Sequence, residues 1–337
     1  MCGGTAFSPN CALTHINWAL VQAWYDHRMD EKAIIDWLLA GDPAIQFQTH
    51  RDLLGEDRGD IQARIATEGW GKRFLDCRNP NGSWGERFYQ PKWISSHYTL
   101  LDLKTLGLEP KNPLVRESIL NVLGDLKGPD GGILCSRVNS ASDVCVNGMF
   151  LDYASYFGMP QDQLCSIVDF LLAEHMADGG FNCQSNYGGA HHSSLHSTLS
   201  VIEGIQEYAD NDYRYRLVEL HQAALASREF ILQHRLFKSD HTGKVIRKDF
   251  LQLSFPPRWY YNILRSLDHF RAAHAPWDGR MSDALAVLNS KRRKDGRWPL
   301  QAAKAGQVHF KMEESRQPSR WNTLLSMRVL KTYPKGS

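Results

Sequence analysis

The sequence lacks long apolar runs, paired cysteine motifs and a strong net charge, and each absence excludes a class of protein. No stretch approaches the ~18–20 consecutive apolar residues of a membrane span, so no transmembrane segment is expected. Its 7 cysteines are scattered without a CxxC pair, which argues against a disulfide framework and for reduced thiols in the cytoplasm. A net charge of +2 gives no reason to expect a nucleic acid partner. Residues 1–10 lack the features of a secretory signal, so we expect a soluble cytoplasmic protein.

What the chain does have is a repeat punctuated by glycine. Of its 337 residues, 42% are hydrophobic, which is enough for a large core. Amphipathic segments each run into a turn of Asp or Asn followed by glycine, with a bulky residue three positions after the acid or amide. Glycine there permits a positive φ and a close approach of the backbone to its neighbour. The clear copies are Asn81-Gly82-Ser83-Trp84, Asp130-Gly131-Gly132-Ile133, Asp178-Gly179-Gly180-Phe181 and Asp295-Gly296-Arg297-Trp298.

A second helix is expected after each turn. Helix-start chemistry places these starts at Ser95, Ser142, Ser194, Pro257 and Ser319. The residues that follow are nearly all apolar or small, whereas the preceding helices are more mixed, which is typical of a buried inner helix paired with a half-exposed outer one. We expect about six such hairpins over residues 34–332. They would form a single domain of residues 1–337, with residues 1–33 as an N-terminal extension packed on the repeats.

This repeat of helix, Asp-Gly-Gly-Phe or Trp, irregular loop and second helix resembles that of terpene cyclases and protein prenyltransferase β-subunits. The resemblance covers nearly the whole chain, from about Ile34 to Leu330. It implies an all-α fold, the α/α toroid of the squalene cyclase type, with inner and outer rings of helices. In that superfamily the inner helices line a central cavity, and their N-termini lie at its mouth. The resemblance leaves the function open, because the scaffold hosts several chemistries.

The first of these chemistries is alkene protonation. Class II terpene cyclases protonate an alkene with an Asp-x-Asp-Asp motif at the start of one inner helix. The matching stretch here is Asp143-Val144-Cys145-Val146, with a cysteine in place of the middle acid. A thiol with a pKa of about 8.5 cannot protonate an alkene, so ordinary class II cyclisation is disfavoured. A metal-free relative would have to use Asp143 as its acid.

The second chemistry is prenyl transfer. Prenyltransferase β-subunits carry Arg-x-Asn-Lys-x-x-Asp-x-Cys-Tyr at the same place, and a histidine at the start of the next inner helix. Arg137, Asn139, Asp143 and Cys145 match this motif in register, and His196 occupies the next start. Two positions depart from the family, with Ser140 in place of the lysine and Val146 in place of the tyrosine.

The resemblance implies that Asp143, Cys145 and His196 bind a catalytic zinc ion and that Arg137 binds an anionic substrate group. One carboxylate, one thiolate and one imidazole leave a fourth coordination position open, as in catalytic zinc sites. A substrate thiol bound there would lose its proton near neutral pH. The family also needs a separate α-subunit, which this chain lacks, so we expect a smaller or different substrate and leave any partner subunit open.

Other inner-helix starts carry residues that would face the same cavity. His97 occupies the position equivalent to Cys145 and His196. Aromatic side chains near these starts would suit a prenyl chain or another apolar ligand, and packing between hairpins explains them equally well. They include Trp93, Trp259, Tyr260 and Trp321.

Three functions follow from the sequence. The leading hypothesis is a zinc-dependent transferase that moves a prenyl or other alkyl group onto a metal-activated nucleophile such as a thiol, with a small prenyl-type or peptide substrate. The first alternative is an atypical, metal-free terpene cyclase relative that uses Asp143 as its acid. The second is a non-catalytic toroid that binds an apolar ligand or a peptide. The site residues favour an enzyme over a binding module.

Overall fold

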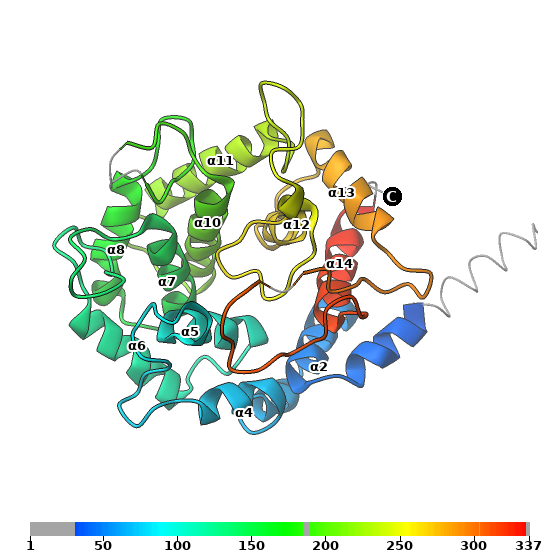
Figure 1. Cartoon of the computed structure of the whole chain (residues 1–337), viewed down its shortest axis with the longest axis horizontal. Coiled ribbons are helices and arrows are strands. Elements are labelled where there is room, and N and C mark those ends of the chain that lie inside the picture. The colour runs from blue at the N-terminus through cyan, green and yellow to red at the C-terminus, as the bar shows by residue number, and fades with distance from the viewer. Residues whose placement is uncertain (1–30, 185–188, 303, 335–337) are drawn as a thin grey trace, which may run out of the picture.

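The computed structural model describes residues 31–184, 189–302 and 304–334. Within these ranges the chain is helical and forms no strand, only isolated bridges between single residues. The expected all-α toroid is confirmed (Figure 1). The expected N-terminal extension over residues 1–33 lies outside the described residues except for residues 31–33, which belong to a helix seen over residues 31–39.

Two concentric rings of helices make up the fold (Figure 1). The inner ring consists of α2 (Pro43–Thr49), α5 (Ser96–Leu106), α7 (Val144–Tyr156), α10 (Leu195–Asp210), α12 (Ile263–Ala272) and α14 (Arg320–Thr332). The outer ring consists of the helix over residues 31–39 and of α4 (Gly69–Asp76), α6 (Pro113–Asp125), α8 (Gln161–Ala173), α11 (Leu217–Gln233) and α13 (Ser282–Ser290). Shorter elements in the connections are η1 (His50–Leu54), α3 (Gly59–Arg64), η2 (Lys92–Ile94), η3 (Lys248–Leu251) and η4 (Gly279–Met281).

The ring closes where α14 packs against α2 and η1. Arg328 of α14 forms buried ion pairs with Asp52 of η1, at 2.6 Å, and with Asp268 of α12. Arg320, at the start of α14, donates a hydrogen bond to the carbonyl oxygen of Trp37 at 3.1 Å. A buried charge left without its partner is strongly destabilising, so Arg328 holds three segments of the ring together.

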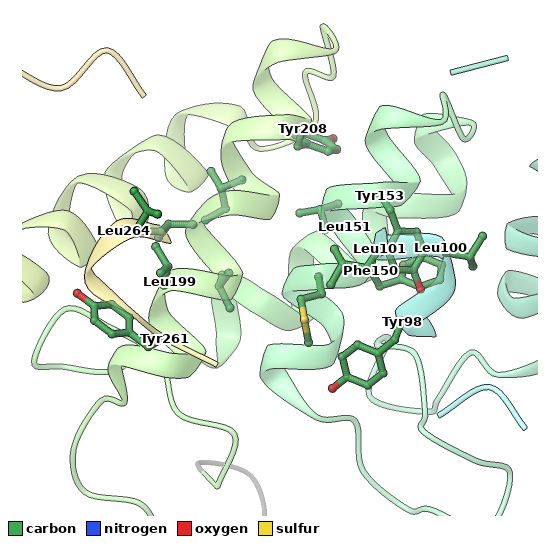
Figure 2. Packing of buried hydrophobic residues seen from close by; sticks show 14 of the residues in the cluster. Tyr98, Leu100, Leu101, Phe150, Leu151, Tyr153, Leu199, Tyr208, Tyr261 and Leu264 are labelled. Carbon is green, nitrogen blue, oxygen red and sulfur yellow. The ribbon is translucent and has the colours of Figure 1, made fainter. Parts of the chain in front are cut away.

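The inner helices α5 and α7 are buried on nearly all sides, because most of their residues are apolar or small. Figure 2 shows Tyr98, Phe150 and Tyr153 gathered between α5 and α7, and Leu199 and Leu264 on the neighbouring helices. The outer helix α8 instead buries a single face, at Leu164, Ile167, Val168 and Leu171. None of the helices in the described ranges is both long and apolar enough to cross a membrane.

Each Asp/Asn-Gly turn is bound to the next inner helix by a hydrogen bond from the backbone N–H of its bulky residue to a side chain of that helix. Ile133, the bulky residue of its turn, donates its N–H to Oδ1 of Asn147 on α7 at 2.6 Å. Gly131 has φ 88°, and a Cβ there would come within 2.8 Å of the carbonyl oxygen of Ser166 on α8. The equivalent bonds run from Trp84 to Ser96, from Phe181 to Thr198 and from Trp298 to Thr323. The turn therefore fixes each inner helix against the outer helices.

The expected start of the fifth inner helix is wrong. We expected it at Pro257, but α12 begins at Ile263, where the side chain of Asn262 accepts a hydrogen bond from the N–H of Arg265 at 2.9 Å. Arg258 takes φ 55°, a left-handed conformation that a helix does not accommodate. The other starts lie within two residues of the expected positions, at α5, α7, α10 and α14.

Two inner helices, α7 and α10, cross at a pair of glycines. A Cβ added to Gly204 would lie 2.2 Å from the carbonyl oxygen of Gly148, and one added to Gly148 would lie 2.6 Å from the Cα of Val201. Both contacts are to backbone atoms, which cannot rotate away. The two helices can pack this closely only because neither residue has a side chain.

We expect Gly204→Ala to lower the free energy of unfolding by about 1–3 kcal/mol, since the two backbones must separate. Gly124→Ala is the matched control, because Gly124 lies in α6 and nothing lies within 4 Å of an added Cβ. There the higher helix propensity of alanine should raise stability by about 0.5–1 kcal/mol. Urea unfolding monitored by circular dichroism measures both, and equal effects would contradict the close crossing.

Candidate functional site

Asp143 stands at the start of α7 with a carboxylate that does not cap the helix. It is the N-cap residue by position, yet its side chain makes no capping hydrogen bond. Instead, the thiol of Cys135 donates to Oδ2 of Asp143 at 3.0 Å. Burial, together with the nearby charge of Asp143, raises the pKa of the Cys135 thiol well above its usual range. The thiol therefore stays protonated and serves as a hydrogen-bond donor to a half-buried carboxyl group.

Cys183 lies at the same helix start and accepts several hydrogen bonds. The backbone N–H of Cys145, in the first turn of α7, donates to Cys183 Sγ at 3.0 Å, and the hydroxyl of Ser197 donates at 3.2 Å. Hydrogen bonding from the Cys145 thiol is the largest cause that lowers the pKa of Cys183, and the same bond raises the pKa of Cys145. Cys145 is thus the donor of the pair and Cys183 the acceptor, so the Cys183 thiol loses its proton more readily than the Cys145 thiol.

Cys183 and Cys135 were not among the site residues expected from the sequence. Each cysteine follows the aspartate of its Asp-Gly-Gly turn by five residues, which is the signal that could have placed both at inner-helix starts. In the structure these repeat-equivalent thiols lie beside Asp143 and Cys145. The missing information was which loop bends toward the start of α7, and only the tertiary structure supplies it.

His196 makes its contacts with the segment before α12. Its Nδ1 accepts the backbone N–H of Tyr261 at 2.8 Å, and its ring packs edge-on against Phe250 and Trp259, with centroids 5.2 Å and 5.1 Å away. Burial lowers the pKa of His196 to about 4, helped by the positive charges of Arg247 and Arg265. The imidazole is therefore neutral near pH 7.

The expected zinc site is not assembled. Within residues 31–184, 189–302 and 304–334, no group of three or more His, Cys, Asp or Glu side chains is placed to hold a metal ion. Asp143 is paired with Cys135, Cys145 with Cys183, and His196 with the backbone of the segment before α12. The side chains expected as ligands thus have other partners, and their arrangement does not fit the metal.

Two further expected site residues lie elsewhere. Arg137, expected to bind an anionic substrate group, has an exposed side chain that pairs with Asp125 at 3.0 Å. His97 is fully buried, and its Nδ1 lies 3.2 Å from the hydroxyl of Tyr153. Burial lowers the pKa of His97 to about 3, so it is a neutral core histidine. Neither side chain lines the central cavity.

Three of the four aromatic residues expected near the inner-helix starts form one continuous cluster. Trp93 contacts Tyr260, with ring centroids 6.2 Å apart, and Tyr260 stacks on Trp259 at 3.9 Å. Cations cover their faces: the ammonium of Lys92 lies 5.7 Å from the Trp259 ring, and that of Lys304 lies 3.9 Å from the Tyr260 ring. Lys92 also lies 5.5 Å from the ring of Tyr89. These π faces therefore attract positive charge.

The segment before α14 covers this cluster. Trp93 donates its Nε1–H to the carbonyl oxygen of Ala305 at 2.6 Å, and the hydroxyl of Thr99 lies 2.9 Å from Nε2 of His309. In Figure 1 this orange-red segment crosses the front of the ring between α14 and α5. The N-terminal end of the inner ring is therefore partly closed by the chain itself.

The central cavity lies toward the other end of the inner helices. It measures about 330 Å³, and much of its lining comes from the second halves of α5, α7, α10 and α12. Trp321 is the expected aromatic residue that lines it, stacked on Phe255 with centroids 4.5 Å apart. The lining also includes apolar residues such as Leu101 and Leu325, but about half of the lining residues are charged. Its basic residues are Arg51, Lys104, Arg258, Arg265, Arg271 and Arg328, and its acidic residues are Asp102, Asp152, Glu203, Glu207, Asp210 and Asp268.

Comparison with known proteins finds similarity in structure only. No family model matches the chain, and no curated protein matches it. Three solved structures of the type II terpene cyclase MstE from Scytonema are similar: the free enzyme, a complex with the substrate geranylgeranyl dihydroxybenzoate and a variant with the product merosterolic acid A. They are 13% identical, with TM-scores of 0.34, 0.31 and 0.33, and the matches cover 82% of this chain and 97–98% of theirs. At this level the likeness concerns the helical arrangement and carries nothing about chemistry.

The thiol pair gives a direct prediction for cysteine reactivity. Because the pKa of Cys183 is lowered and that of Cys165 is raised by burial, the rate of alkylation of Cys183 should rise at lower pH than that of Cys165. Ser197→Ala removes one donor and should move the Cys183 profile to higher pH. Iodoacetamide labelling read by peptide mass spectrometry measures the pH midpoint, which does not depend on accessibility. A Cys183 midpoint at or above that of Cys165 would contradict the assigned polarity.

Proposed function

We propose that this protein is a metal-independent enzyme that protonates an alkene-bearing, prenyl-type small molecule at the start of α7, with Asp143 as the acid. The observation that supports this most is the half-buried carboxyl group of Asp143, which leaves its helix uncapped and receives the thiol of Cys135 at 3.0 Å. A carboxyl group held by a donor, beside an aromatic cluster, suits proton delivery to an apolar substrate.

The chemistry follows from what surrounds this carboxyl group. The proton passes from Asp143 to one alkene carbon, a C–H bond forms, the π bond breaks and the other carbon becomes cationic. The Cys135 thiol then stabilises the carboxylate that remains, and so does the N-terminus of α7. The faces of Trp259 and Tyr260 lie under ammonium groups, and the same faces would stabilise a carbocation. The cation is discharged by loss of a proton or by capture within the substrate.

A second candidate keeps the expected alkyl transfer without the metal. It rests on Cys183, whose sulfur accepts hydrogen bonds from the Cys145 backbone and from Ser197. The lowered pKa of Cys183 makes it the better nucleophile of the two cysteines. It would attack an electrophilic carbon of the substrate, form an S–C bond and displace a leaving group, which departs with the bonding electron pair. Proton transfer from Asp143 and nucleophilic attack by Cys183 are different reactions. Substituting each residue in turn distinguishes them.

Turnover of prenyl alcohols, prenylated phenols and prenyl diphosphates by the purified full chain, followed by mass spectrometry, is the test. Asp143→Asn should lower the rate by about 10²–10⁴-fold, the usual contribution of a general acid. Cys183→Ser should change it little, and so should Cys145→Ser, which is the conservative control at the neighbouring position. A metal chelator should have no effect.

Each other outcome identifies a different function. Loss of activity in Cys183→Ser but not in Asp143→Asn would replace proton transfer by nucleophilic transfer. Loss of turnover with a chelator, restored by added zinc, would instead support the zinc-dependent transferase. Absence of turnover together with an apolar molecule extracted from the purified protein would indicate the non-catalytic binding toroid.

A further inference from the structure

Among the residues that the structure describes, one cation of the central cavity is incompletely paired. Around it, Lys104 contacts Asp152 and Glu207, each at 2.9 Å, and Arg265 is bidentate to Glu203. Arg271 and Arg328 both pair with Asp268, and Arg51 with Asp52. Arg258 differs, since its nearest carboxylate oxygen, Oδ2 of Asp102, is 3.7 Å away, too far for a hydrogen bond.

Arg258 is also deeply buried. Its side chain is 6% exposed, and its Nε–H finds no hydrogen-bond partner within the described part of the chain. A guanidinium group has five N–H donors, and burying them unpaired is costly. The facing Asp102 is 2% exposed, and its Oδ2 likewise accepts no hydrogen bond there. The guanidinium of Arg258 and Oδ2 of Asp102 thus face each other without a hydrogen bond, and the donors of Arg258 could bind a third group.

From this arrangement we infer that the central cavity is a binding site for a small organic monocarboxylate, whose carboxylate group pairs with the guanidinium of Arg258. The site lies outside the cluster around Asp143, so this inference does not depend on the proposed reaction. Nothing in it requires the ligand to be the substrate of that reaction.

The backbone holds Arg258 in place for such a role. Its φ of 55° is unfavourable for a residue with a side chain and persists only where the surroundings impose it. Its guanidinium carbon lies 4.6 Å from the centre of the Trp93 ring, so one face of the group is already covered. The cation is thus rigid before a ligand arrives, which lowers the entropy cost of binding.

The other polar groups of the cavity also favour an anion. Nε1 of Trp321, an N–H donor, is buried without a partner among the described residues. Burial raises the pKa of Asp102 to about 6, against the opposing charge of Arg258, so this acid gives up its negative charge readily. An added carboxylate would then take over the pairing that Asp102 makes only at a distance.

Size and charge limit the ligand to one negative charge. The lining carries equal numbers of basic and acidic side chains, and all the cations except Arg258 have carboxylates at bonding distance. A second negative charge would face Asp152, Glu203 and Glu207 without compensation. A volume of about 330 Å³ admits a small molecule. The planar fork of an arginine suits a carboxylate, which accepts two parallel hydrogen bonds.

Calorimetric titration of the full chain with acetate and propionate, at ionic strength held constant with sodium chloride, tests the inference. Saturable one-to-one binding is expected, and inorganic phosphate should bind more weakly. Arg258→Gln should weaken carboxylate binding by about 10–100-fold, the loss of a hydrogen bond to a charged group. Arg258→Lys keeps the charge without the fork and should weaken it less. Arg271→Gln, which removes another cavity cation, is the matched control and should leave binding within about twofold.

Asp102→Asn should change the affinity for acetate in the opposite direction. Removing the competing acid frees Arg258, so acetate should bind several-fold more tightly, which a merely structural role of the pair would not produce. If Arg258→Gln fails to fold, Arg258→Lys and Asp102→Asn decide the question. Absence of saturable carboxylate binding, unchanged affinity in the Arg258 variants, or weaker binding in Asp102→Asn would each overturn the inference, as would phosphate binding more tightly than acetate.

Discussion

The contact between the first and last inner helices is the constraint on which the rest of the structure depends. The inner helix α7 buries apolar or small residues on nearly every face, so it needs a neighbour on both sides. An open array of such helices would leave one apolar face in water. Closure places Arg328 between Asp52 and Asp268. Burial raises the pKa of Asp52, but the hydrogen bond from Arg51 and the charge of Arg328 lower it to about 2. The charged network is thus part of the ring and not an addition to it.

Closure also divides the interior into two chemically different ends. At the helix starts lie thiols, one carboxyl group and an aromatic cluster, covered by the segment before α14. At the other end lies a cavity lined by ion pairs. Trp93 stands between them, in contact with Tyr98 and Tyr260 on the one hand and with the guanidinium of Arg258 on the other. Our two proposals accordingly place an apolar substrate at the first end and a small carboxylate at the second.

The site could be predicted in part. Repeat alignment led to Asp143, Cys145 and His196, which do lie at inner-helix starts, but it assumed that equivalent positions point at a common centre. Zinc ligation is not supported, because no three of these side chains come together among the described residues and each has another partner, the backbone of Tyr261 in the case of His196. The sequence did not indicate Cys183, because the groups that lower its pKa lie elsewhere in the chain. They are the backbone N–H and the thiol of Cys145 on α7 and the hydroxyl of Ser197 on α10, and no single repeat contains them all.

The amino-acid sequence by itself determined the all-α hairpin repeat, since the glycine turns and the contrast between inner and outer helices are local patterns that repeat. Closure of the hairpins into a toroid was implied by the resemblance of this repeat to that of terpene cyclases and prenyltransferase β-subunits, and not by its periodicity. The sequence also determined four inner-helix starts, because caps act within a few residues. The tertiary structure alone decided the start of α12, where Arg258 adopts a left-handed backbone. It alone decided the thiol pairing and the charged cavity as well. Those depend on distances between side chains far apart in the chain, and periodicity carries no information about such distances.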